Sequence, residues 1–264
     1  MRRRWPALSA ERVDEMAIQL RSAVEMEKMF RAGQVVHEVL NALKVEVKPG
    51  VTTMDLEQIA EAIIAKRPGK AAFKGYRGYP CVLCTSVNSE IVHGIPSPKR
   101  KLHAGDIVSI DFGMEVDGYF GDSAVTVPVG KIQPELQKLL DVTRESLDRA
   151  IDKMRPGNRL GDVGHAVQSW VEQNGFSVVR EFVGHGIGTK MHEEPQVPNY
   201  GTPGSGPKLR DGMVLAIEPM VNVGRSETRV LADNWTAVTK DGTHSAHFEH
   251  TVAVTKNGPV ILTE

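Results

Sequence analysis

The feature that most restricts the fold of this chain is an internal repeat. Segments of the first half recur in the second half, in the same order, as a proline-glycine turn, a helix and a strand. The matched segments are Lys48–Gly50 with Arg155–Gly157, Asp55 with Asp162, Gly105–Asp111 with Gly212–Glu218, and Asp122–Val127 with Glu249–Val254. Asp111 and Glu218 lie 107 positions apart (218 − 111 = 107), a period far too long for a solenoid. The repeat predicts two α/β halves, related by a pseudo-two-fold axis, whose sheets meet in one core.

A hairpin is expected at residues 107–122. Two apolar runs flank Asp117-Gly118, a strong turn signal between paired strands. A tight turn there would place Asp111 opposite Ala124, and Asp122, two residues away, would face the same side of the sheet. Carboxylates on an apolar strand are costly to bury unless they bind a cation or another partner. A solvated sheet face is the alternative.

The repeat favours the cation. Asp111 and Asp122 in one half correspond in the repeat to Glu218 and Glu249 in the other half. Two halves meeting at an axis would therefore bring four acids together. Four converging carboxylates cannot all stay ionised without cations. His185 would add a fifth ligand, and this mostly oxygen set suits two divalent metals bridged by a carboxylate and a water. The chemistry implied is metal-assisted hydrolysis, whereas four unrelated surface acids would leave the matched spacing unexplained.

The composition is that of an ordinary globular chain of one large or two small domains, with 264 residues, 41% hydrophobic and 25% charged. A net charge of −1 gives no bulk attraction to nucleic acid or membranes. No apolar run approaches the roughly 20 residues of a membrane span, and no apolar stretch follows Arg2–Arg4 as in a secretory signal. Cys81 and Cys84 have C-x-x-C spacing without a second pair for zinc, which favours inert thiols in a reducing compartment.

We expect a single catalytic domain at residues 22–264, in halves of about 22–130 and 131–264, after a poorly ordered extension at residues 1–21. Ser22 and Glu25 form a capping-box pattern at the start of the first helix. Helices are expected at about 22–43, 53–66, 134–154 and 160–172, and strands at 80–96, from 107, 176–183, 213–221, 248–254 and 259–263. Met16 is a second plausible translation start, which the intact mass of protein made from the native gene would test.

A series of short motifs follows in a distinctive order. They are Gly-Tyr-Pro (78–80), Val-His-Gly-Ile-Pro (92–96), Ser-Ile-Asp (109–111), Gly-Asp (121–122), Gly-His-Gly-Ile-Gly (184–188), His-Glu-Glu-Pro-Gln-Val (192–197), Ile-Glu-Pro-Met-Val (217–221) and Glu-His-Thr (249–251). Together they resemble the type I methionine aminopeptidases of bacteria, in the pita-bread metallopeptidase family, from about Ser22 to Glu264. The resemblance implies an α/β (α+β) pita-bread fold, with two pseudo-two-fold related halves, a central curved antiparallel sheet and helices outside.

The resemblance also implies roles, matched position by position. The metal ligands would be Asp111, Asp122, His185, Glu218 and Glu249, with Asp122 and Glu249 bridging. Glu218 would in addition take the proton of the attacking water. His192 would donate to the scissile carbonyl oxygen, and His93 would lie beside the scissile amide. A lone histidine is more often structural, and that reading is kept for His37, His103, His165, His244, His247 and His250.

A pocket for the methionine side chain is implied as well. Its lining would be Phe73, Tyr76, Tyr79, Cys84, Met191 and Trp235, a wall that suits an unbranched thioether. Phe73 and Met191 stand where a smaller residue and a phenylalanine are familiar in the family, and Phe120 stands where histidine is often found. A monovalent cation near Asn88, Glu90 and Ser245 is also implied.

The expected function is therefore removal of the initiator methionine from nascent proteins with a small second residue. The cofactors would be two divalent metal ions, among Co, Mn, Fe and Zn. We expect a cytoplasmic monomer that meets the ribosome transiently and binds neither membranes nor specific nucleic acid. One alternative is an Xaa-Pro aminopeptidase or prolidase of the same fold, although these usually carry an extra N-terminal domain for which the first 22 residues leave no room. The other alternative is a non-enzymatic binding protein on this fold, which would be expected to have lost ligands.

Overall fold

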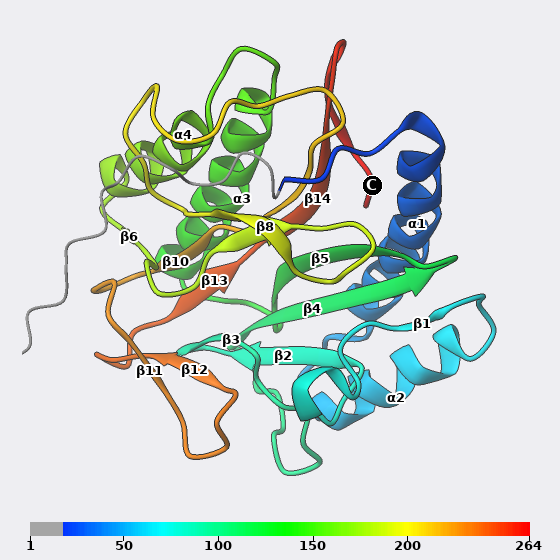
Figure 1. Cartoon of the computed structure of the whole chain (residues 1–264). Helices are drawn as coiled ribbons and strands as arrows, with labels where there is room; N and C mark the ends of the chain where they lie inside the picture. The colour runs from blue at the N-terminus through cyan, green and yellow to red at the C-terminus, as the bar shows by residue number, and fades with distance from the viewer. Residues whose placement is uncertain (1–17) are drawn as a thin grey trace, which may run out of the picture.

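The computed structural model describes residues 18–264 (Figure 1). The proposed start at Met16 and most of the predicted extension lie outside the described residues. Its last four residues are described, and two of them, Ile18 and Arg21, are buried, at 9% and 8% exposure.

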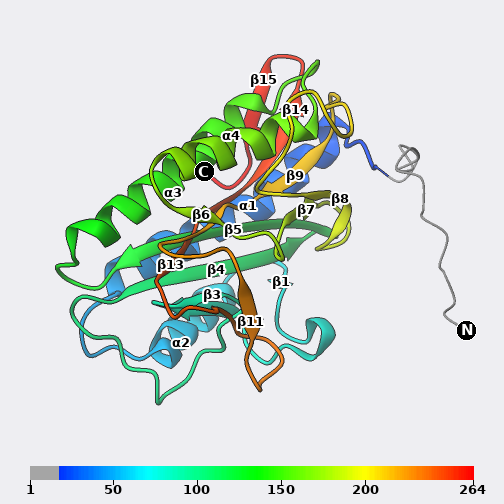
Figure 2. The same cartoon turned by 90° about the vertical axis from the view of Figure 1, so that its left-hand side faces the viewer.

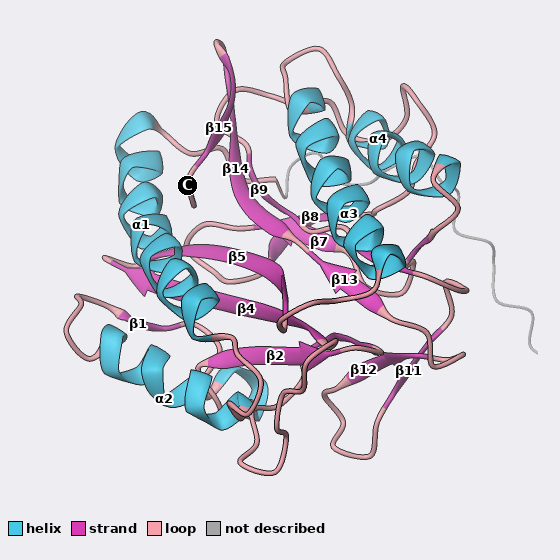
Figure 3. Cartoon of the chain, turned by 180° about the vertical axis from the view of Figure 1, so that it is seen from behind, coloured by secondary structure: helices cyan, strands magenta, loops and turns pink. Residues whose placement is uncertain are grey.

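The helices agree with the predicted ranges. They are α1 (Ala23–Glu46), α2 (Thr53–Ile64), α3 (Pro134–Lys153) and α4 (Leu160–Gln173), with a short 3-10 turn at Tyr76–Gly78. The predicted capping box begins α1: Ser22 accepts from the Glu25 N–H, and the Glu25 carboxylate accepts from the Ser22 N–H. Proline opens α3 at its first turn. Figure 3, seen from behind, shows α1 and α3 crossing over the strands, and Figure 2 shows α3 and α4 lying side by side.

The strands are short except at the centre of the main sheet. They are β1 (Lys70–Ala71), β2 (Leu83–Val87), β3 (Glu90–Val92), β4 (Ile107–Val116), β5 (Tyr119–Pro128), β6 (Ser177–Val178), β7 (Gly184–Gly186), β8 (Glu193–Val197), β9 (Val214–Ile217), β10 (Met220–Asn222), β11 (Thr228–Val230), β12 (Ala237–Thr239), β13 (Ser245–His247), β14 (Glu249–Thr255) and β15 (Gly258–Ile261). The main sheet runs β1-β4-β5-β14-β9-β7-β8, with β2 on β4 and β15 on β14. Two smaller sheets, β13-β10-β6 and β11-β12-β3, flank it.

The predicted hairpin is β4 and β5, and its register is confirmed. Asp111 pairs with Ala124, and Asp122 pairs with Gly113, so both carboxylates face one side of the sheet. Asp117 and Gly118 have φ of +52° and +79°, the left-handed pair that a two-residue hairpin turn requires.

The two halves join where β5 pairs with β14. Glu249 lies opposite Ala124, and the Thr251 hydroxyl both accepts from the Asp122 N–H and donates to the Asp122 carbonyl, at 3.0 and 2.8 Å. Each half has its own apolar cluster, one around α3, α4 and β9, the other around α1, α2 and β4. The junction of the halves therefore sets Asp122 and Glu249 side by side.

Three predicted strands differ from the structure. The run at 213–221 is divided into β9 and β10, which belong to different sheets. The run at 80–96 is broken by a turn, in which Asn88 has a left-handed φ of +59°, so that β2 and β3 join different sheets. The run at 176–183 forms only β6, and the next strand begins at Gly184. Among the described helices, none is both long and apolar enough to cross a bilayer.

Candidate active site

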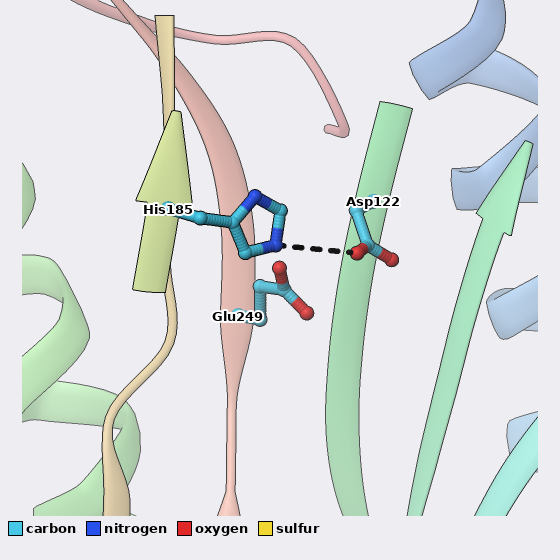
Figure 4. A group of neighbouring side chains, drawn as sticks. All are labelled: Asp122, His185 and Glu249. Atoms are coloured by element: carbon cyan, nitrogen blue, oxygen red, sulfur yellow. Dashed lines mark ion pairs between the residues drawn. The ribbon is translucent and has the colours of Figure 1, made fainter. Parts of the chain in front are cut away.

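Five polar side chains, four on separate strands and one just after a fifth strand, converge on one cavity of about 150 Å³. Asp111 lies on β4, Asp122 on β5, His185 on β7 and Glu249 on β14, while Glu218 follows the last residue of β9. Figure 4 shows the side chains of Asp122, His185 and Glu249 pointing toward one another. The structure therefore brings together all of the predicted metal ligands.

The distances suit a shared cation. Ligand atoms of Asp122, His185 and Glu249 all lie within 4.8 Å of one another. Nε2 of His185 is 4.0 Å from Oδ2 of Asp122 and 3.7 Å from Oε1 of Glu218. Nδ1 of His185 lies 2.9 Å from the carbonyl oxygen of Gly186, an acceptor, so Nδ1 carries the proton. The lone pair of Nε2 then faces the carboxylates, as it does in a metal-ligating histidine.

The acids are buried without enough partners of their own. Oδ1 of Asp111, Oδ1 of Asp122 and Oε1 of Glu249 are inaccessible to solvent and accept no hydrogen bond. Burial raises the pKa of Asp122 to about 7 and raises the pKa values of Asp111, Glu218 and Glu249 well above their usual range. These orphaned oxygens, with one neutral imidazole among them, fit a divalent metal centre.

The two histidines expected to act on the substrate line the same cavity. The His192 ring lies 4.2 Å from that of His185 and stacks on Tyr76 at 5.3 Å, with 21° between the planes. His93 has a left-handed φ of +61°, unusual for a residue with a side chain, and such backbone conformations cluster at functional sites. Burial lowers the pKa of His93 to about 4, so its imidazole is neutral near pH 7.

The wall of the cavity is apolar. All of the predicted methionine-pocket residues line it: Phe73, Tyr76, Tyr79, Cys84, Met191 and Trp235. The Tyr79 ring meets Trp235 edge-on at 5.0 Å, and its hydroxyl hydrogen-bonds to the carbonyls of Leu83 and Gly94, at 2.9 and 3.0 Å. These contacts fix Tyr79 between β2 and the loop that carries His93.

The two cysteines are free and buried. Burial raises the pKa of Cys81 to about 11 and raises the pKa of Cys84 well above its usual range. Both are therefore thiols rather than thiolates at neutral pH, which agrees with the prediction that they are inert.

Two residues at the site were not predicted. Arg77 lines the cavity, and His247 lies beside Glu218. His247 was read as structural, yet its Nε2 lies 3.7 Å from Oε2 of Glu218 and has no hydrogen-bond partner. Burial lowers the pKa of His247 to about 3, so the ring is neutral. In the sequence, His247 stands two residues before the predicted ligand Glu249, so both could face the same side of a strand. This alternation alone does not distinguish a site residue from a histidine packed in the core.

The residues suggested for a monovalent cation lie beside one another. The Asn88 carbonyl accepts from the N–H of Ser245 at 2.9 Å, and the Asn88 side chain bridges Asp106 and the N–H of Ile107. The Glu90 carboxylate accepts from the N–H of Val87 at 2.7 Å. Their side chains are thus already hydrogen-bonded, which leaves backbone carbonyls as the ligands to test.

A second hollow adjoins the site. It has a volume of about 710 Å³ and shares Arg77, His185 and His192 with the inner cavity. Its remaining lining is mostly polar, with Gln19, Lys190 and Glu194 among its residues. The inner cavity is thus apolar on its wall and opens toward a polar groove.

Comparisons with known proteins point to one family. Residues 27–256 match the model of metallopeptidase family M24. A methionine aminopeptidase of Clostridium acetobutylicum is 52% identical over 244 residues, 92% of this chain and 98% of that protein. The solved methionine aminopeptidase of Thermotoga maritima superposes with a TM-score of 0.92 at 49% identity, over 94% of this chain and 99% of that one.

A prolidase has the same fold, with lower structural similarity and lower sequence identity. The solved enzyme from Pyrococcus horikoshii superposes with a TM-score of 0.74 at 22% identity, over 95% of this chain but 64% of that one. This likeness extends to the fold alone. With the methionine aminopeptidases it confirms the predicted pita-bread architecture.

Proposed function

This chain belongs to metallopeptidase family M24, and we propose that it is a methionine aminopeptidase, a hydrolase that removes the N-terminal methionine of polypeptides. The observation that carries this proposal is the cluster of unpartnered buried carboxylates beside an apolar pocket. Relatives with this name match nearly the whole chain at about half identity, which supports the expected enzyme class over the alternatives.

We propose that Asp111, Asp122, His185, Glu218 and Glu249 would hold two divalent ions, and that Asp122 and Glu249 would serve both, as the resemblance implies. The family supports a divalent metal, and the oxygen-rich ligand set suits Mn, Fe, Co or Zn. A divalent metal bound here would polarise a carbonyl and lower the pKa of a water molecule toward 7.

The chain's own groups complete the reaction. Glu218 takes a proton from the water that adds to the scissile carbonyl carbon, and returns it to the amine nitrogen as the C–N bond breaks. His192, on the loop facing His185, donates to the carbonyl oxygen as negative charge develops there. His93 lies beside the scissile amide. All three line the same cavity.

The apolar wall receives the methionine side chain. Tyr79, Trp235 and Met191 offer aromatic faces and a flexible thioether, which suit an unbranched sulfur-containing chain. The polar groove beyond His192 then takes the residues that follow the scissile bond. We propose in addition a preference for a small second residue, a cytoplasmic monomer, transient ribosome contact, and a monovalent cation at the Asn88 and Ser245 backbone.

Three peptides test the function. With divalent metal present, we expect free methionine to be released from Met-Ala-Ser and, more slowly, from Met-Leu-Ser. An Ala-Pro peptide should remain intact. If the Ala-Pro peptide were hydrolysed faster than Met-Ala-Ser, the protein would instead be a prolidase. Bound metal without cleavage of any peptide would identify a binding protein.

A further inference from the structure

A carboxylate holds the loop that carries Met191 and His192. The loop, residues 187–192, joins β7 to β8 and has no regular secondary structure. Oε1 of Glu193 accepts hydrogen bonds from the backbone N–H groups of Thr189 and Lys190, at 2.9 and 3.1 Å, and from the Thr189 hydroxyl at 3.3 Å. The conformation of the loop therefore depends on where this carboxylate is held.

Arg21 holds the carboxylate. Its guanidinium forms an ion pair and a hydrogen bond with Oε2 of Glu193, and the two side chains are only 6% and 10% exposed. The second carboxylate near Arg21, on Glu25, is 4.0 Å away and is occupied by the capping box and the Tyr119 hydroxyl. Removing one partner of a buried ion pair leaves the other charge uncompensated, so neither residue can be replaced without effect.

The position of Arg21 is itself fixed. Its N–H donates to the carbonyl of Gly212 at 2.7 Å, just before β9. Its guanidinium packs under Gly188, where an added Cβ would lie 2.1 Å from Nη2. The Gly188 carbonyl in turn accepts from the N–H of Phe120, two residues before Asp122 on β5, at 2.9 Å. Arg21 thus lies between the strand that leads to Glu218 and the loop that presents His192.

We infer that Arg21 is a positioning residue of the active site, which through Glu193 fixes the loop bearing Met191 and His192 against the metal centre. This inference rests on the proposed function for its catalytic consequence, but its structural part stands without it. The segment before α1 therefore supports the active site, although Arg21 and Glu193 are 172 positions apart in the sequence. A displacement of about 1 Å in a catalytic group can lower a rate by as much as ~100-fold.

The first test is a double-mutant cycle. Arg21→Met removes the charge and keeps the stem, and we expect kcat for Met-Ala-Ser to fall roughly 10-fold or more. In a His192→Ala background the same change should cause little further loss of kcat, because Arg21 acts through that loop. Arg31→Met is the matched control on α1, since Arg31 pairs with Glu27 at 3.6 Å with both side chains exposed, at 59% and 60%, and it should leave kcat unchanged.

The second test does not depend on activity. Hydrogen exchange of the Thr189 and Lys190 amides should speed up in Arg21→Met and Glu193→Gln, and stay as in wild type in Arg31→Met. Arg21→Lys keeps the charge, and we expect it to fold normally and to recover part of the exchange protection. Unchanged exchange in Glu193→Gln, or an equal fold-loss of kcat with and without His192, would overturn the inference. A wild-type protein without aminopeptidase activity would contradict the proposed function alone, because the exchange result would still decide the role of Arg21.

Discussion

Glu218 lies between two histidines, one at each carboxylate oxygen. Nε2 of His185 is 3.7 Å from Oε1, and Nε2 of His247 is 3.7 Å from Oε2. Both rings are neutral near pH 7, because burial lowers the pKa of each to about 3. His247 faces the proposed base from the side away from His185, where it can orient the carboxylate.

His247→Ala should therefore lower kcat/KM for Met-Ala-Ser by roughly 10- to 100-fold, the usual loss for a partner of a metal-site residue. His103→Ala is the control, because that side chain is 73% exposed and lines neither the cavity nor the polar groove. Activity equal to wild type in His247→Ala would show that Glu218 needs no support from this side.

Glu218→Gln should abolish turnover. The amide keeps the shape of the side chain, but it cannot take a proton from water and is a weaker metal ligand. Methionine release and metal content should be measured on the same preparation. Appreciable turnover in this variant would require a different base.

His192→Ala should lower kcat by about 10²–10³, the loss typical of one oxyanion donor. Metal content, measured by elemental analysis, should stay unchanged, because His192 is not among the proposed ligands. Loss of metal together with activity would instead make His192 part of the metal centre.

The metal-free protein should lose stability through Asp122 as pH rises. The pKa of Asp122 in the folded state, about 7, lies above the ordinary value of 3.8 expected in the unfolded chain. Between these two pH values the folded state keeps a proton that the unfolded chain has released. The contribution of Asp122 is thus fully present below about pH 4 and declines by at most ~1.4 kcal/mol per pH unit up to about pH 7.

Asp122→Asn isolates this effect from the buried histidines, whose lowered pKa values act in the opposite direction over a similar range. Without metal, the variant should melt above wild type at about pH 8 and level with it at about pH 4. Added divalent metal should reverse the order at about pH 8, because only wild type keeps the complete ligand set. Wild type melting above the variant at about pH 8 without metal would contradict the account.

Gly33→Ala tests the packing of α1 rather than the chemistry. An added Cβ would lie 2.0 Å from the carbonyl oxygen of Leu262, and Gly121 packs against the same part of the helix. A backbone neighbour cannot rotate away, so we expect a loss of several kcal/mol in unfolding free energy. Chemical denaturation would measure it. Gly175→Ala is the comparison for backbone strain without a clash, because its φ is +86° but nothing lies within 4 Å of an added Cβ, so its loss should be the smaller.

The parts of the fold and site that the sequence predicts are those with a local or repeated signal. The Asp117-Gly118 turn is enough to predict the register that places Asp111 opposite Ala124. The repeat predicts that Asp122 and Glu249 meet, because each holds the corresponding place in its half.

Other features depend on contacts that no local pattern encodes. His247 touches Glu218 only because β13 runs beside β10, and Arg21 reaches Glu193 across 172 positions. The turn at Asn88 was missed for a related reason, since a left-handed asparagine can interrupt an apolar run without glycine or proline.

The most direct test of the central claim is methionine release from Met-Ala-Ser by protein stripped of metal, followed by stepwise addition of Mn(II), Co(II), Fe(II) or Zn(II). The account predicts no release before addition, and release that rises with bound metal in wild type but not in Glu249→Ala. Undiminished release from the stripped protein, or metal-dependent release that survives loss of Glu249, would contradict it.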